Sequence, residues 1–274
     1  VTHSEKAADY MADGYARLSR RPGVVMAQSV GAANLAAGLQ DAYLAHSPVI
    51  ALTGRKPPLY QHRNAYQEIQ HGPLFDAVTK YRAGIDEAAQ LPLVLPQLFR
   101  EAVTGAPRPV QADLLGLSGE LVEQGEAGDL PAGAAAQYTA FPAFRPAGDA
   151  AAIDEALQRI ARAERPILVA GGGAVASGAA GEILRLAEAL ALPVATSMAG
   201  KGILPENHPL AVGVVGSYSQ TCANRSVGAA DLVLFVGSGT GDQVTLDWTL
   251  PASGTQVVQI DIQPAELGRS YPGA

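Results

Sequence analysis

The feature that most constrains the fold of this 274-residue chain is an alternation of short apolar runs with longer, helix-like stretches. The runs are too short for helices, and several end near a glycine, which is typical of buried strands. We expect strands at residues 24–28, 48–53, 110–114, 166–170, 193–196, 231–236 and 256–262. Because helix-like stretches separate them, the sequence predicts an α/β fold with two open, mostly parallel, doubly wound sheets.

The stretches between these runs carry apolar residues at the three- and four-residue spacing of one helix face. The first stretch, residues 6–18, places Ala8, Met11, Tyr15 and Leu18 in this way. Further helices are expected at 31–43, 73–81, 88–104, 150–163, 181–190 and from residue 222 onward. Strands and helices therefore alternate in both halves of the chain.

The segment 116–149 separates the two halves and differs from both. It is rich in glycine, alanine and proline and has little periodicity. Such a composition predicts an interdomain linker. The sequence thus divides into a first domain at 1–115 and a second at 150–274.

The composition excludes several classes of function. The net charge is −7 and no basic block occurs, which argues against a nucleic-acid partner. No apolar run approaches the ~20 residues that a membrane helix needs, so no membrane partner is expected. Cys222 is the sole cysteine, which excludes a disulfide framework and a cysteine-based zinc site. We expect a globular cytoplasmic protein.

A glycine run follows the expected strand at 166–170. Gly171, Gly172 and Gly173 lie between this strand and a helix-like stretch. Glycine lets backbone amides approach a phosphate, and a helix N-terminus favours negative charge. These glycines are candidate cofactor-binding residues, and a tight strand-to-helix turn is the alternative interpretation.

A second glycine-rich loop follows the strand at 231–236 and contains Gly237 and Ser238. Ligands of open α/β sheets bind at the carboxyl ends of strands, where both loops lie. Asp261, at the end of the strand at 256–262, could accept hydrogen bonds from a ribose or an adenine. Its alternative role is to cap the turn that follows.

Two further candidate positions lie in the first half. Glu5 stands at the start of the first helix, where an acidic residue ordinarily caps the helix. A buried glutamate there would have a raised pKa and could exchange a proton with a heterocycle nitrogen. The polar residues from 61 to 71 include Gln67 and His71 and could line a site, although solvated loop surface is the simpler interpretation. No metal site is expected, since the histidine spacing lacks a matching carboxylate set.

An ordered set of motifs runs through almost the whole chain. In the first half they are His-Ser-Glu at 3–5, Met-Ala-Asp-Gly-Tyr-Ala-Arg at 11–17, Ser-Val-Gly-Ala-Ala-Asn at 29–34 and Ala-Tyr-Gln-Glu at 65–68. In the second they are Gly-Gly-Gly at 171–173, Gly-Lys-Gly at 200–202, Pro-Glu-Asn-His-Pro at 205–209 and Ile-Asp-Ile at 260–262. In this order they resemble the thiamine-diphosphate enzymes of the acetolactate synthase (acetohydroxyacid synthase large subunit) branch.

The resemblance implies roles for the first-half candidates. Residues 1–115 resemble part of a pyrimidine-binding domain, in which Glu5 would bond the aminopyrimidine N1′ of thiamine diphosphate. Gly31 and Asn34 would pack near the pyrimidine, and Gln67 would reach the substrate. Glu5 and Gln67 are therefore the expected catalytic residues.

The resemblance also implies cofactors and partners. Residues 150–274 resemble a Rossmann-like central domain, where Gly171, Gly172, Gly173, Gly237, Ser238 and Asp261 would adjoin FAD. Mg²⁺ would be held with the diphosphate by a third domain, whose Gly-Asp-Gly…Asn motif does not occur in this sequence. We expect a piece of a longer homodimeric or homotetrameric enzyme, inactive by itself.

The implied reaction is cleavage and carboligation of C–C bonds in 2-oxo acids, a transferase or lyase activity. Two departures from the synthases leave alternatives open. The loop at 57–64 differs from theirs, so a C–C hydrolase or lyase acting on a diketone remains an alternative. The loop at 237–243 lacks the arginines of their Gly-x-Arg-Phe-Asp-Asp-Arg loop. A non-catalytic nucleotide-binding module is the third interpretation.

Overall fold

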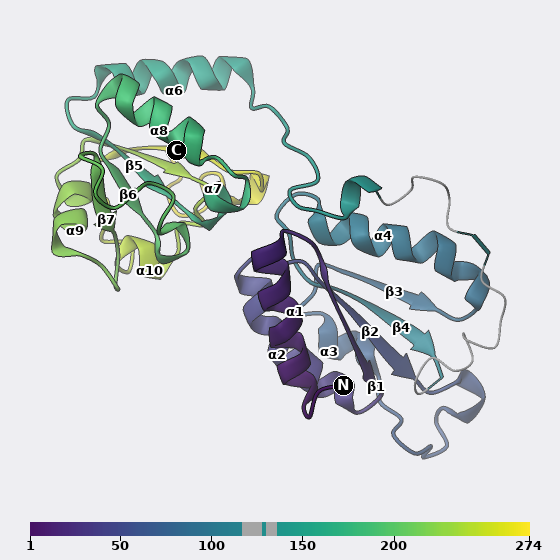
Figure 1. Ribbon diagram of the computed structural model, residues 1–274. Coiled ribbons are helices and arrows are strands. Elements are labelled where there is room, and N and C mark those ends of the chain that lie inside the picture. Colours follow the sequence, from purple (N-terminus) through teal and green to yellow (C-terminus); the bar gives the residue numbers. More distant parts are fainter. Residues whose placement is uncertain (117–127, 130–135) are drawn as a thin grey trace. The chain divides into compact units, whose positions relative to one another are not determined.

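The computed structural model describes residues 1–116, 128–129 and 136–274 of the chain. They form two compact units, Val1–Phe144 and Arg145–Ala274. Each contains one parallel sheet with interleaved helices (Figure 1), which confirms the predicted α/β class. Within the predicted linker at 116–149, residues 117–127 and 130–135 lie outside the described residues. The end of that segment packs on the first unit, where the amide of Phe141 donates to the carbonyl of Arg20 at 3.0 Å.

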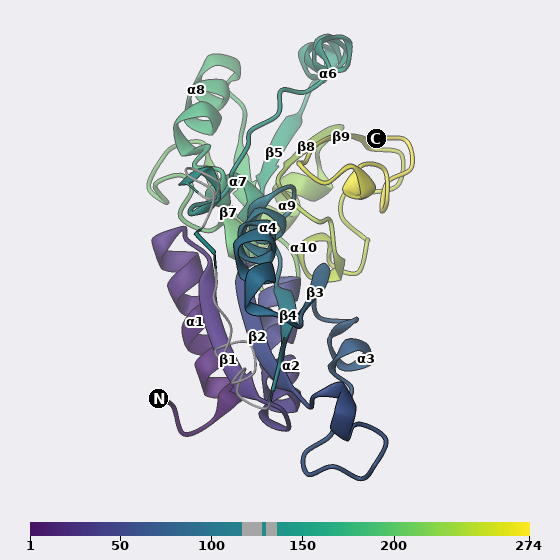
Figure 2. The same ribbon diagram turned by 90° about the vertical axis from the view of Figure 1, so that its right-hand side faces the viewer.

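The first unit is built on a four-stranded sheet in the order β1-β2-β4-β3. Its strands are β1 (Gly23–Gln28), β2 (Val49–Arg55), β3 (Tyr81–Ile85) and β4 (Val110–Leu115). Its helices are α1 (Glu5–Ser19), α2 (Gly31–Leu44), α3 (His71–Phe75) and α4 (Leu91–Val103), with short 3-10 turns at Pro58–Tyr60, Ala88–Gln90 and Ala136–Tyr138. Figure 2 shows the strands side by side, from β1 beside α1 to β3.

Both faces of this sheet are covered by helices, as the burial of successive β2 residues shows. Val49 and Ala51 join the cluster formed with α1 and α2, whereas Ile50 between them is buried outside it. Helix α4 contacts β2, β3 and β4. At the edge, α1 comes so close to β1 that a Cβ on Gly23 would lie 2.3 Å from the carbonyl oxygen of Ala12. Only glycine allows this approach.

The second unit has a five-stranded parallel sheet in the order β7-β6-β5-β8-β9. Its strands are β5 (Pro166–Ala170), β6 (Val194–Thr196), β7 (Ala211–Val214), β8 (Leu232–Val236) and β9 (Gln256–Ile260). Its helices are α6 (Ala150–Arg162), α7 (Gly172–Ala176), α8 (Ala180–Leu190), α9 (Thr221–Gly228) and α10 (Asp242–Thr245), with 3-10 turns at Met198–Gly200 and Pro264–Glu266.

The second sheet also separates two cores. Leu168 and Ala170 of β5 pack with α8, whereas Ile167 and Val169 enter the cluster that contains residues of α9. The strand order runs outward in both directions from β5, so the connections leaving β5 and β8 diverge to opposite faces. The loops after these two strands therefore meet at the place where open α/β sheets hold their ligands.

The sequence prediction missed strands β3 and β7 and the short helices α7 and α10, and it misplaced one helix. The expected helix at 73–81 is the short α3, which is followed by β3 at the sheet edge. Strand β7, at the edge of the second sheet, was also not predicted. Both edge strands are short and contain a glycine, so they lack the continuous apolar run that marks the interior strands.

Candidate functional site

A side-chain hydrogen bond between two of the predicted first-unit residues joins α1 to α2. The Asn34 side-chain amide donates to Oε2 of Glu5 at 2.9 Å. A Cβ on Gly31 would lie 2.7 Å from Oε1 of the same carboxylate. Glu5, Gly31 and Asn34 are therefore brought together at the N-terminal ends of the two helices.

The carboxyl group of Glu5 is only partly buried in this chain, unlike the buried glutamate considered above. The hydrogen bond from Asn34, followed by one from the backbone amide of Glu5 itself, holds the pKa of Glu5 below its ordinary value. Desolvation is the weaker, opposing effect. The carboxylate is thus ionised, oriented and accessible.

Gln67 adjoins the same end of α2 through its backbone. Its carbonyl accepts a hydrogen bond from the Ser29 hydroxyl, two residues before the first turn of α2. Gln67 has a left-handed backbone (φ 58°), and its side-chain amide donates to the Tyr66 hydroxyl at 3.2 Å. The structure therefore places the loop that carries Gln67 beside this helix end, while the amide itself faces Tyr66.

A buried polar network supports this loop, and sequence reasoning missed it. His71, at 2% exposure, bonds through Nε2 to the carbonyl of Ser29 at 3.1 Å. Its Nδ1 lies 2.9 Å from Oδ1 of Asp113 and 3.0 Å from the Thr53 hydroxyl. The buried Gln111 donates to both Thr53 and Asp113. His71 is thus a core residue and not the solvated loop residue that we expected.

The network decides the ionisation of Asp113. Burial by itself would raise its pKa, but hydrogen bonds from His71, Gln111 and Thr53 outweigh that effect and lower it. The sequence did contain a signal, because polar side chains lie at the carboxyl-terminal halves of two adjacent buried strands, β2 and β4. An ionised Asp113 anchors His71, which in turn anchors Ser29 beside the Gln67 loop.

In the second unit, the glycine amides that could cradle a phosphate are bonded to the chain itself. The amide of Gly171 donates to Val236 at 2.8 Å, and that of Gly173 to Gly237 at 2.9 Å. The amide of Gly237 donates to Ile260 at 2.8 Å. These three hydrogen bonds link the ends of β5, β8 and β9. Because the three N–H groups are already used, they do not fit a site in which the same amides bind a pyrophosphate.

Close packing explains why these positions are glycines. A Cβ on Gly171 would lie 2.2 Å from the carbonyl oxygen of Gly237, and one on Gly172 would lie 3.0 Å from the Ala199 Cβ. Gly237 has a left-handed backbone (φ 58°), and its Cβ would lie 2.4 Å from the amide of Ala174. The two loops are locked together, so their glycines have a packing role. A contact with a cofactor stays a prediction.

The last two predicted residues, Ser238 and Asp261, follow the carboxyl ends of β8 and β9. Ser238 is buried directly after Gly237. Oδ1 of Asp261 accepts a hydrogen bond from the amide of Gln263 at 2.8 Å, which stabilises the turn before Pro264–Glu266. Partial burial raises the pKa of Asp261. Its observed contact is thus the local capping that was the alternative interpretation.

Two general findings bound the chemistry of the described residues. No three of their histidine, cysteine, aspartate and glutamate side chains cluster closely enough to hold a metal ion. None of their helices combines the length and apolarity needed to cross a bilayer.

Two family models match the chain, one in each of its two units. Residues 1–74 match the thiamine pyrophosphate enzyme N-terminal TPP binding domain, and residues 153–274 match the thiamine pyrophosphate enzyme central domain. The chain belongs to the thiamine pyrophosphate enzymes. Glu5, Gly31, Asn34 and Gln67 lie within the first match, whose TPP-binding character supports thiamine diphosphate as the cofactor of this family member.

Among known thiamine pyrophosphate enzymes, the chain is similar to acetolactate synthases. It is 39% identical over 273 residues to the probable acetolactate synthase large subunit of Methanocaldococcus jannaschii, covering 98% of this chain and 45% of that protein. It is 36% identical to the acetolactate synthase of Arthrospira platensis (98% and 47% coverage). It is 31% identical to the acetolactate synthase large subunit of Lactococcus lactis (98% and 46%). The chain spans about half the length of these relatives, and the resemblance predicted from its motifs is confirmed.

Proposed function

We propose that this chain supplies the pyrimidine-binding side of the active site of an acetolactate-synthase-like enzyme. The observation that carries the proposal is the carboxylate of Glu5, which Asn34 holds at 2.9 Å beside Gly31. The residues fit the cofactor because a rigidly placed, accessible carboxylate can bond a ring nitrogen. The absence of a side chain on Gly31 leaves room for that carboxylate.

Thiamine diphosphate, when bound, supplies the electron sink that C–C bond cleavage of a 2-oxo acid requires. The task of this chain is to hold and move a proton at the Glu5 carboxyl. In the free chain the hydrogen bond from Asn34 lowers the pKa of Glu5. Covering the carboxyl with a ligand would remove water and raise that pKa, because desolvation disfavours the charged form. Glu5 would then share a proton with the ring nitrogen.

The 2-oxo acid substrate and the transferase or lyase chemistry are proposed from the names of the relatives, which favour carboligation over the hydrolysis of a diketone. Gln67 is proposed to reach the substrate from the loop that Ser29 fixes beside α2. This step needs a rotation of its side chain away from Tyr66. A module that only binds nucleotides would require neither Glu5 nor Asn34.

The deciding experiment is Glu5→Gln in the full-length protein, with pyruvate as substrate and acetolactate as the measured product. We expect activity to fall by about 10²–10⁴-fold, the usual contribution of a positioned acid or base. Glu155→Gln, an exposed residue of α6, is the matched control and should retain activity. Unchanged acetolactate formation in Glu5→Gln would refute the proposal, and diketone hydrolysis without carboligation would select the hydrolase alternative.

The remaining expectations stay proposals of the same enzyme. Mg²⁺ and the diphosphate are assigned to a third domain by the family resemblance, so we propose that the 274 residues alone do not turn over substrate. Association into a homodimer or homotetramer and a cytoplasmic location also stay predictions. FAD is supported by the resemblance alone, since the amides of Gly171, Gly173 and Gly237 are bonded to carbonyls. A flavin absorption spectrum of the full-length protein tests it.

A further inference from the structure

A second carboxylate follows Glu5 one turn later on α1 and has no role in the proposed chemistry. Asp9 is 0% exposed, and neither of its side-chain oxygens has a hydrogen-bond partner among the described residues. An ionised carboxylate buried without a partner is very unfavourable, whereas the neutral acid costs much less. The burial of Asp9 therefore calls for an explanation.

Asp9 and Glu5 contact α2 in the same manner. A Cβ on Gly38 would lie 2.7 Å from Oδ2 of Asp9, as a Cβ on Gly31 would from Oε1 of Glu5. Glu5 and Asp9 are four residues apart on α1, and the two glycines are seven apart on α2, so each pair lies on one side of its helix. Helix α1 thus rests on α2 through two successive carboxyl groups.

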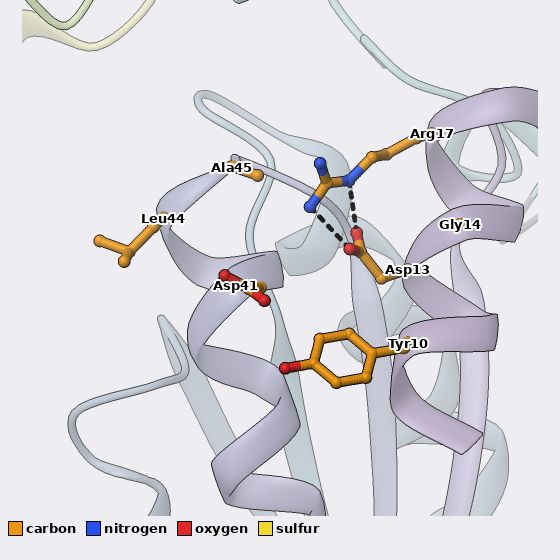
Figure 3. Close-up of a pocket in the computed structure, with 7 residues that line it drawn as sticks. All are labelled: Tyr10, Asp13, Gly14, Arg17, Asp41, Leu44 and Ala45. Atoms are coloured by element: carbon orange, nitrogen blue, oxygen red, sulfur yellow. Dashed lines mark hydrogen bonds and ion pairs between the residues drawn. The ribbon is translucent and has the colours of Figure 1, made fainter. Parts of the chain in front are cut away.

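The surroundings of Asp9 are acidic. Besides Asp9, the charged residues of α1 are Glu5, Lys6, Asp13 and Arg17, the only charged residue of α2 is Asp41, and β1 has none. Figure 3 shows the hydroxyl of Tyr10 pointing toward Asp41, and Asp13 further along α1, where Arg17 binds it through Nε at 2.8 Å and Nη2 at 2.6 Å. Arg17 is thereby engaged by Asp13.

The charges of these neighbours act together with burial. Burial, together with the nearby carboxylates of Asp13 and Asp41, raises the pKa of Asp9 to about 7. The charge of Asp41 also raises the pKa of the Tyr10 phenol. Loss of the Asp9 proton to solvent would place a third negative charge between the two helices, beside Asp13 and Asp41.

We propose that Asp9 is a positioning residue for Glu5, whose uncharged carboxyl group seats α1 on α2. When Asp9 is ionised, repulsion from Asp13 and Asp41 and the need for water move α1 away from α2. Glu5 then leaves its place beside Gly31 and Asn34. This inference rests on the proposed catalytic role of Glu5, but the seating of the helix can be observed without catalysis.

The test uses the full-length protein and two readouts between pH 5.5 and 9. The first is kcat/KM for acetolactate formation, which should fall about tenfold per pH unit above an apparent pKa near 7. The second is hydrogen exchange of the α1 backbone amides, corrected for intrinsic exchange rates. Their protection should decrease over the same pH range.

Three variants separate positioning from a general effect of pH. Asp9→Asn has nearly the same shape and no charge, so both the alkaline fall in kcat/KM and the pH-dependent loss of protection should disappear. Asp41→Asn removes one repelling charge while keeping Asp9, so the midpoint of both curves should move to lower pH. Asp154→Asn, an exposed residue of α6, is the control and should shift neither curve.

The possible results are distinguishable. An alkaline fall that persists unchanged in Asp9→Asn, or a midpoint that does not move in Asp41→Asn, overturns the inference. Should Asp9→Asn fail to fold, Asp41→Asn still decides. The protein could also lack thiamine-diphosphate-dependent activity at every pH, while Asp9→Asn still abolishes the pH dependence of α1 protection. That result would support the role of Asp9 in packing α1 on α2 and would refute the proposed function instead.

Discussion

At the scale of single residues, Asn34 sets the state of the candidate catalytic carboxylate. Its amide is the main cause of the lowered pKa of Glu5, and the backbone amide of Glu5 contributes less. One hydrogen bond therefore both orients the carboxylate and favours its charged form. An amide is suited to this position because it donates a hydrogen bond without adding a charge to the proposed binding site of a ring nitrogen.

Asn34→Ala should raise the pKa of Glu5 toward its ordinary value, because the principal hydrogen bond to the carboxylate is lost. A carboxyl-selective NMR titration of this chain, labelled at glutamate, measures the change directly. The substitution should not disturb core packing, because Asn34 is exposed and lies outside the buried core. An unshifted Glu5 would show that Asn34 does not control its ionisation.

At the scale of helices and strands, the sequence predicted the interior of each sheet better than its edges. Strand β5 has the predicted bounds because it is continuously apolar and buried on both faces. Strands β3 and β7 escaped prediction because their short runs, Tyr81–Ile85 and Ala211–Val214, are each interrupted by a glycine. The other two edge strands, β1 and β9, were predicted. The contact between Glu5 and Asn34 joins residues 29 positions apart, which spacing alone does not reveal. The family motifs placed both residues near the same cofactor ring but did not predict their hydrogen bond.

The polar network shows a further limit of sequence reasoning. His71 follows a polar loop, so its surroundings in the sequence predict exposure, but α3 turns it into the core against Thr53 and Asp113. Asp9 was also overlooked, although it lies on the α1 face that buries Ala12 and Ala16. An acidic residue at helical spacing with buried alanines is the signal that could have identified it.

Asp113→Asn should lower the free energy of unfolding of the first unit at pH 7 by about 1–3 kcal/mol, the range for hydrogen bonds to a charged, partly buried group. The folded-state pKa of Asp113 is lowered, so its stabilisation is present above the ordinary pKa of 3.8 and lost as pH falls through the folded value. The difference between variant and wild type should therefore shrink under acid conditions. Urea unfolding of the full-length protein at several pH values measures it, and a difference that is independent of pH would contradict the ionised network.

At the scale of the whole molecule, the described residues form two units with separate hydrophobic cores. Each sheet is covered on both faces by its own helices, so neither core requires residues of the other unit. Multidomain chains of this kind need not unfold in a single step. The candidate groups divide in the same way, with the carboxylate chemistry in the first unit and the glycine loops in the second.

Leu234→Ala should therefore destabilise only the second unit. Leu234 lies in β8 at 2% exposure, and truncating such a residue costs about 2–5 kcal/mol. Hydrogen exchange of the full-length protein should accelerate across β5 and β8 and stay unchanged across β1 and β2. Equal acceleration in both units would show that they unfold together.

The interlocked loops after β5 and β8 also decide where this protein can be redesigned. Their glycine positions are closed to mutation, because a methyl group at Gly171 or Gly237 would collide with the main chain. Gly241 is different: a Cβ there meets nothing within 4 Å, and its backbone is in an extended conformation that any amino acid adopts. A library that seeks to introduce nucleotide affinity into the second unit should begin at this site and leave the locked turn intact.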